Sequence, residues 1–181
     1  MRYFLPAFIF FLLSCNMLAQ SDSIQETDAA PEETISNASP QTKAMVIDLS
    51  NPADVELTLK RIHTFKYLES VVLEGETDES TLHKILFRLS VLKNLSALTL
   101  KDNELNKVPE NIKGIKTLRS ISIEGNTELD YNDLCNKLST LPITNLKLTD
   151  NGLKQTPPTF SAIKTLTKIE ITGSDQLNYE N

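Results

Sequence analysis

The chain has 181 residues, of which 40% are hydrophobic and 23% are charged, and its formal net charge is −6. This length suits one domain with or without appendages, and the composition excludes a wholly disordered chain, a multi-span membrane protein and a collagen-like fibre. An acidic chain also lacks the basic face that nucleic-acid binding needs. The apolar residues include 27 Leu and 14 Ile but no Trp, which indicates an aliphatic core of the kind that repeated coils build.

Residues 1–19 have the pattern of a signal for export. Arg2 precedes an apolar run from Tyr3 to Leu13, which is shorter than the ~20 residues that a membrane-spanning helix requires. Ala19 fits ordinary signal-peptidase cleavage before Gln20, whereas Leu12 to Cys15 resembles the bacterial lipobox, in which Cys15 would become the lipidated first residue. Both routes remain open. In either case we expect export to the periplasm, the outer membrane or the extracellular space.

Residues 20–43 have the composition of a linker. They carry five acids and one base, and their only aliphatic side chains larger than Ala are Ile24 and Ile35. Too few apolar groups are present to build a core, so this segment is predicted to be a disordered, acidic linker.

A repeated pattern, L-x-x-L-x-L-x-x-N, begins at Ala44 and is clearest from Leu95 to Asn103. Copies start at residues 44, 68, 95, 118, 143 and 166, so the intervals are 24, 27, 23, 25 and 23 residues. Within each copy the apolar alternation predicts a short strand with one buried face.

The repeats resemble the leucine-rich-repeat family, whose period of ~20–29 residues brackets every interval. The segment from Leu105 to Leu118 also matches the L-x-x-L-P-x-x-I-x-x-L-x-x-L tail common in bacterial members. The resemblance covers residues 44–181 and implies an α/β solenoid of about six coils. It further implies a parallel sheet on the concave face and a mixed helical, 3-10 and extended convex side.

The return segments differ in expected conformation. Those with prolines, after Asn103 and Asn151, are predicted to be extended or 3-10. Three others are predicted to be helical: one starting at Asn51-Pro52, one after Asp78 to Ser80, and one after Asp130. In the family, an Asn at the turn bonds backbone groups of neighbouring coils; here that role falls to Asn103, Asn126 and Asn151.

Signals for catalysis are weak. His63 and His83 fall in different coils, and no Cys/His pair has the spacing of metal ligands. Cys135, flanked by Leu134 and Leu138, is better read as a small core residue than as a nucleophile. We therefore expect a protein that is not an enzyme and has neither cofactor nor metal.

The family's usual binding surface is the concave sheet, whose outward positions are read in three columns. The first is Val46, Ser70, Ala97, Ser120, Asn145 and Lys168; the second is Asp48, Val72, Thr99, Ser122, Lys147 and Glu170; the third is Ser50, Glu74, Lys101, Glu124, Thr149 and Thr172. This face is polar, mixed in charge and without an aromatic anchor.

From these columns we expect a protein-binding module of the cell envelope with these contact residues: Asp48, Ser70, Val72, Glu74, Thr99, Lys101, Ser122, Glu124, Asn145, Lys147, Lys168 and Glu170. The alternative is a structural envelope lipoprotein that self-associates through its C-terminal edge, where Leu166, Ile169 and Ile171 would be exposed. The sequence identifies neither the partner nor the leaflet of the membrane.

Overall fold

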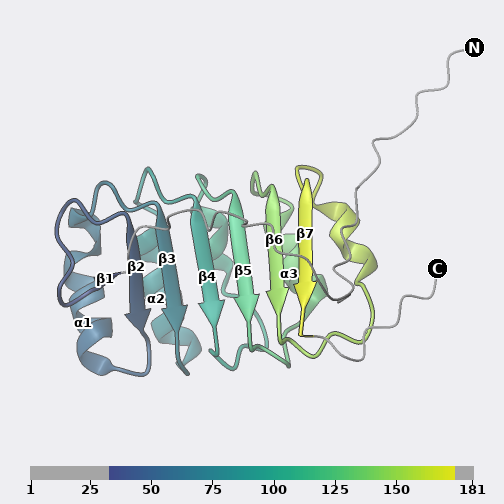
Figure 1. Ribbon diagram of the computed structural model, residues 1–181, viewed down its shortest axis with the longest axis horizontal. Helices are drawn as coiled ribbons and strands as arrows, with labels where there is room; N and C mark the ends of the chain where they lie inside the picture. Colours follow the sequence, from purple (N-terminus) through teal and green to yellow (C-terminus); the bar gives the residue numbers. More distant parts are fainter. Residues whose placement is uncertain (1–32, 174–181) are drawn as a thin grey trace, which may run out of the picture.

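The computed structural model describes residues 33–173, and these form a solenoid around one parallel sheet (Figure 1). Seven strands follow one another in the order of the chain: β1 (Glu33–Thr34), β2 (Ala44–Asp48), β3 (Ser70–Glu74), β4 (Ala97–Lys101), β5 (Ser120–Glu124), β6 (Asn145–Thr149) and β7 (Lys168–Thr172). Every neighbouring pair is parallel. The expected α/β class with a parallel sheet is therefore observed, in an arrangement that fits a leucine-rich-repeat solenoid.

The return segments contain α-helices in three coils, the first of which is continued by a 3-10 turn, and 3-10 turns alone in two others. The helices are α1 (Pro52–Arg61), α2 (Glu79–Leu89) and α3 (Tyr131–Leu138), and the 3-10 turns are η1 (Ile62–Thr64), η2 (Glu110–Gly114) and η3 (Pro158–Ala162). The side chains of Asn51, Asp78 and Asp130 cap the three helices by accepting backbone N–H groups of the first turn. The three predicted helices and the two proline-containing 3-10 returns are thus confirmed.

The core lies between the sheet and the returns, and α2 and α3 lie behind the strands in Figure 1. In β2 to β6 the second and fourth residues of each strand are buried, whereas the first, third and fifth are not. Buried Leu, Ile and Val side chains supply most of the core, with Phe65 and Phe160 as its aromatic members. The high Leu and Ile content of the sequence is therefore explained by the core that the repeated coils share.

The first coil lies two residues earlier than the repeat pattern predicts. Ala44 pairs with Ser70 and Asp48 with Glu74, so Thr42, and not Ala44, takes the position that Leu68 takes in the next coil. Thr42 is buried, and its hydroxyl donates to Glu33 Oε2 (2.6 Å) and accepts from Ser39 N (2.9 Å). A polar residue is tolerated there because both of its hydrogen-bonding functions are satisfied.

The ordered body also begins before residue 44. Residues 33–43, expected to belong to the linker, place β1 beside β2 and bury Ile35 completely. Burying this aliphatic side chain covers the end of the core next to β2, which would otherwise face water. The sheet consequently has seven strands where the repeat pattern predicts six coils. Residues 20–32 of the predicted linker, the signal at 1–19 and Cys15 lie outside the described residues.

The turns after β4, β5 and β6 contain the buried asparagines Asn103, Asn126 and Asn151, which bond backbone groups of neighbouring coils. Asn126 Nδ2 donates to the carbonyls of Leu100 (3.1 Å) and Glu124 (2.8 Å), and its Oδ1 accepts from Leu105 N (3.1 Å). Asn151 continues the series by donating to Ile123 O (2.7 Å) and accepting from Asn126 N (2.8 Å). Neighbouring coils are therefore linked through backbone groups that the sheet leaves free.

Candidate binding surface

No described helix or strand covers the outward side of the sheet, and its side chains form what we call the open sheet face. Strand pairing aligns them in three columns: Ala44, Ser70, Ala97, Ser120, Asn145 and Lys168; Val46, Val72, Thr99, Ser122, Lys147 and Glu170; Asp48, Glu74, Lys101, Glu124, Thr149 and Thr172. Because the strands are hydrogen-bonded in register, these positions are fixed relative to one another before any partner arrives.

All twelve predicted contact residues lie on the open sheet face, and the three columns align as predicted across the five strands β3 to β7. The exception is the first coil. Asp48 was predicted beside Val72 but lies beside Glu74, and Val46 takes the place next to Val72. Ser50, predicted in the third column, lies beyond the end of β2. Residues of the first coil are misplaced because the pattern was read from Ala44 and not from Thr42.

Part of the charge on the open sheet face is neutralised within it. Lys101 Nζ lies 3.4 Å from Glu74 Oε2, and this hydrogen bond with its Coulomb attraction raises the pKa of Lys101. Lys168 lies 3.2 Å from Glu170. Lys147 is exposed and forms no ion pair within residues 33–173. Its ammonium is therefore the cation on this face that a partner meets without first displacing a carboxylate.

The two ends of the open sheet face differ in exposure. On β3 and β4 its residues are only partly exposed, whereas Asn145, Lys147 and Lys168 on β6 and β7 are exposed. Polar side chains that reach into solvent give a partner more hydrogen-bonding groups at the β6–β7 end. Among the predicted contact residues, Asn145, Lys147 and Lys168 are thus the most accessible, whereas Glu170 on β7 is only partly exposed.

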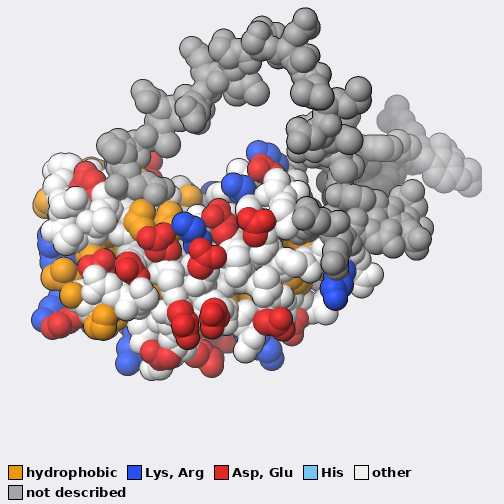
Figure 2. Space-filling view, turned by 60° about the horizontal axis from the view of Figure 1, so that its bottom comes forward, with side chains coloured by type: hydrophobic (Ala, Val, Ile, Leu, Met, Phe, Trp, Pro, Cys, Tyr) orange, Lys and Arg blue, Asp and Glu red, His pale blue; other side chains and the backbone are white. Residues whose placement is uncertain are grey.

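A second charged surface, which we call the acidic edge, lies where the strands end, and sequence reasoning missed it. Figure 2 shows acidic side chains gathered on the side turned toward these strand ends. They belong to the ends of strands and the turns that follow: Asp48, Glu74, Glu76, Asp78, Asp102, Glu104, Glu124, Glu128, Asp130 and Asp150. The opposite edge, where the strands begin, carries Lys43, Lys66, Lys93, Lys116 and Arg119. The net charge thus conceals a partial separation of charge, with Lys101 among the acids at the strand ends and Glu69 among the bases at the strand starts. This separation is visible in the sequence only once the strand boundaries are known.

The residues weighed for catalysis are not brought together. His63 lies on η1 and His83 on α2, both exposed. Cys135 is fully buried, and burial raises the pKa of its thiol. A buried neutral thiol is a poor nucleophile. Within residues 33–173 no group of three or more His, Cys, Asp or Glu side chains has the geometry to hold a metal ion.

A helix that crosses a membrane must be both long and apolar, and the helices within residues 33–173 are not. Each described helix is too short or too polar to cross a bilayer.

Comparison with protein-family models and with curated protein sequences yields no match. Among solved structures, the chain is similar to the functional domain of InlJ from Listeria monocytogenes, which includes a cysteine ladder. That similarity has a TM-score of 0.38 and 15% sequence identity, and it covers 66% of this chain and 28% of the other. The chain thus spans less than a third of the length of that structure, and a superposition this loose carries no information on what the present protein binds.

Proposed function

We propose that this protein is a non-catalytic binding module that holds a partner protein on the open sheet face. The observation that supports the proposal is a parallel sheet whose outward side chains are aligned by strand pairing and left uncovered by any described element. Such a surface is preorganised, so little conformational entropy is lost when a partner binds. Because it has no aromatic anchor, we expect a polar contact of modest affinity.

The cellular setting is part of the proposal. The apolar run from Tyr3 to Leu13 and the following lipobox-like Cys15 support export to the cell envelope, with a lipid anchor if the lipobox is used. Intact mass of the mature protein distinguishes the two routes. A chain that begins at an acylated Cys15 is a lipoprotein, a chain that begins at Gln20 is released, and a chain that retains Met1 contradicts export by either route.

Charge reversal tests the binding surface. A photo-crosslinking residue at position 145 should first capture the partner from an envelope extract, and the purified pair is then titrated. Lys147→Glu and Lys101→Glu should each weaken binding about tenfold, the loss expected for one charge-assisted contact. Thermal stability should change little.

Two lysines of the return segments serve as matched controls. Lys113 is paired with Glu110 (2.6 Å), as Lys101 is with Glu74, and Lys164 is exposed like Lys147. Lys113→Glu and Lys164→Glu should leave the affinity unchanged. If they weaken binding as much as the sheet variants do, the open sheet face is not the binding surface.

The second candidate function is the self-associating structural protein. Leu166, Ile169 and Ile171 pack against the core but remain partly exposed at the β7 end of the described sheet. Sedimentation over a wide concentration range decides this case. Reversible dimerisation that Ile169→Lys abolishes would support it, and a monomer at every concentration would remove it.

A further inference from the structure

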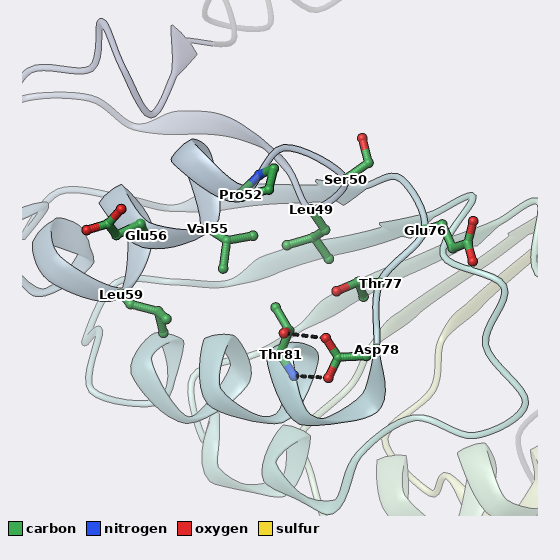
Figure 3. A pocket seen from close by; sticks show the side chains of 10 residues that line it. All are labelled: Leu49, Ser50, Pro52, Val55, Glu56, Leu59, Glu76, Thr77, Asp78 and Thr81. Atoms are coloured by element: carbon green, nitrogen blue, oxygen red, sulfur yellow. Dashed lines mark hydrogen bonds between the residues drawn. The ribbon is translucent and has the colours of Figure 1, made fainter.

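A groove of 700 Å³ lies between the turns that connect β2 to α1 and β3 to α2 (Figure 3). Its apolar side is made by Leu49, Pro52, Val55 and Leu59. Val55 and Leu59 lie one turn apart on α1, are only half-buried, and point toward α2 in Figure 3. The groove therefore exposes aliphatic surface that no described residue covers.

Carboxylates lie around this apolar floor, but two of them already have partners. Glu56 is paired with Lys60 (2.5 Å). Asp78 accepts hydrogen bonds from the backbone N–H (2.9 Å) and the hydroxyl (2.6 Å) of Thr81, as the dashed lines in Figure 3 show. Glu76 is exposed and forms no ion pair within residues 33–173. Glu76 and Asp78 thus both keep their negative charge at the groove, and of the two only the Glu76 carboxylate has no hydrogen-bond partner among residues 33–173.

The groove opens onto the acidic edge. Ser50 lines it, and the Ser50 hydroxyl donates to Asp48 Oδ1 (2.6 Å), which is the last residue of β2. Beyond Asp48 and Glu74 the acidic residues of later coils continue along the same edge. A chain that leaves the groove in this direction remains beside negative charge over several coils.

We propose that this groove binds a lysine side chain of an extended basic segment of a partner protein, with neighbouring basic residues lying along the acidic edge. A lysine has a four-carbon stem that fits against apolar surface and an ammonium that stays at its rim. Leu49 and Val55 suit the stem, and Glu76, which lies on the far side of Leu49 from Leu59 in Figure 3, suits the ammonium. Acidic segments are repelled, and a purely apolar segment leaves the carboxylate unused.

The groove itself shares no side chain with the open sheet face, but the acidic edge beyond it does, because Asp48, Glu74 and Glu124 belong to both surfaces. A second copy of the chain is the main competing occupant, since the strand-start edge is basic. The acidic edge would attract a basic partner segment and the basic edge of a second copy alike. The test must therefore separate a dedicated lysine groove from general attraction to the edge and from self-association.

The experiment is a fluorescence-anisotropy titration of the full chain with a short labelled peptide of alternating lysine and serine. A peptide with glutamate in place of lysine tests the charge. A peptide with diaminopropionate in place of lysine removes most of the stem; both peptides are titrated at mildly acidic pH, where the shorter amine is also protonated and the charge is kept. We expect no binding of the glutamate peptide and about tenfold weaker binding of the diaminopropionate peptide, because the shorter side chain loses its apolar contact.

Variants locate the site. Glu76→Gln, nearly isosteric and on the surface, should weaken lysine-peptide binding about tenfold. Glu128→Gln removes the same charge from another coil of the acidic edge and should change it less than about twofold. Val55→Thr keeps the shape of the floor but replaces one methyl group with a hydroxyl, and should weaken binding about threefold.

Equal effects of Glu76→Gln and Glu128→Gln would overturn the proposal, since attraction would then be spread along the edge. Equal binding of the lysine and diaminopropionate peptides would overturn the role of the apolar floor. Sedimentation of the chain alone completes the test: concentration-dependent association that Glu76→Gln abolishes would identify a second copy as the occupant and overturn the basic partner. If Glu76→Gln weakens peptide binding but leaves binding of the open-face partner unchanged, the groove and the open sheet face are separate sites.

Discussion

The carboxylate of Asp102 occupies the position that a side chain on Gly125 would need. A Cβ built on Gly125 would overlap with Asp102 Oδ1, and the same relationship recurs between Asp150 and Gly173. The first residue after β3 to β7 has positive φ in each case: Gly75 (88°), Asp102 (52°), Gly125 (65°), Asp150 (54°) and Gly173 (64°). Glycine and aspartate alternate along this row because each aspartate side chain lies against the next glycine.

This relationship predicts a position-dependent cost of adding a methyl group. Gly125→Ala introduces both the left-handed strain of ~1–2 kcal/mol and a clash with Asp102, so we expect a loss of roughly 3 kcal/mol in the free energy of unfolding. Gly152→Ala is the matched control: its φ is 64°, but the nearest atom to its Cβ is 3.8 Å away. It should lose only ~1 kcal/mol. Urea titration measures both, and equal losses would show that Asp102 yields freely.

The buried asparagines Asn103 and Asn126 should lose different amounts of stability when each is replaced by alanine. Asn126 uses both ends of its amide, whereas Asn103 donates to Leu73 O (3.2 Å) and Gly75 O (2.8 Å) but its buried Oδ1 accepts no hydrogen bond within the described chain. Asn126→Ala strands more backbone groups and should cost ~3 kcal/mol, against ~2 kcal/mol for Asn103→Ala. Thermal and urea denaturation of the two variants compares them directly. A larger loss for Asn103→Ala would contradict this account.

Most of the solenoid could be predicted because its determinants are local and repeated. Buried Leu and Ile recur at fixed offsets, and helix-capping residues such as Asp78 and Asp130 precede their helices directly. Reading the register from Leu95 or Leu118 therefore placed the strands of those coils correctly.

The parts that could not be predicted depend on tertiary contacts. Thr42 is polar in sequence, and only its hydrogen bonds to Glu33 and Ser39 make it a core residue. Ile35 stands alone among polar residues, yet it is buried because it covers the first coil. The acidic edge was likewise hidden, since its carboxylates are adjacent only after the coils stack. The groove at Glu76 joins two coils and has no signature within either.

We expect the buried side chain of Lys137 to link the stability of α3 to that of the preceding coil. Its side chain is almost fully buried, and its ammonium donates to Val108 O (2.5 Å) and lies 2.5 Å from Asp133 Oδ2. Lys137→Met keeps the aliphatic stem but leaves the Asp133 carboxylate and the Val108 carbonyl unpaired. Because Asp133 is only partly buried, breaking this pair should cost ~2 kcal/mol, less than for a fully buried pair.

A second substitution checks the cause of that loss. Asp133→Asn in the Lys137→Met background removes the unpaired charge and should recover ~1 kcal/mol. Chemical denaturation of the single and double variants gives the coupling energy. Additive losses would mean that the two side chains act independently and that packing, and not charge, explains the cost.

Because the phenol of Tyr131 is buried, we expect the protein to lose stability at high pH. Its hydroxyl is buried without a hydrogen-bond partner in the described part of the protein, and burial raises the pKa of Tyr131 to about 12. In the unfolded chain the pKa of tyrosine is about 10. A pKa that is higher in the folded state favours folding fully below pH ~10, and this contribution is lost as the pH rises from ~10 to ~12. Tyr131→Phe removes the titrating group, so wild type should lose stability relative to the variant across that interval.

At neutral pH the same variant should be at least as stable as wild type, because an unpaired buried hydroxyl is removed and the ring is kept. Urea midpoints of both proteins at pH 7 and between pH 10 and 12 measure the difference. A constant difference across the alkaline range would show that the phenol ionises in the folded protein as readily as in the unfolded chain. A variant clearly less stable at pH 7 would show that the hydroxyl has a partner, such as a bound water, between α3 and η3.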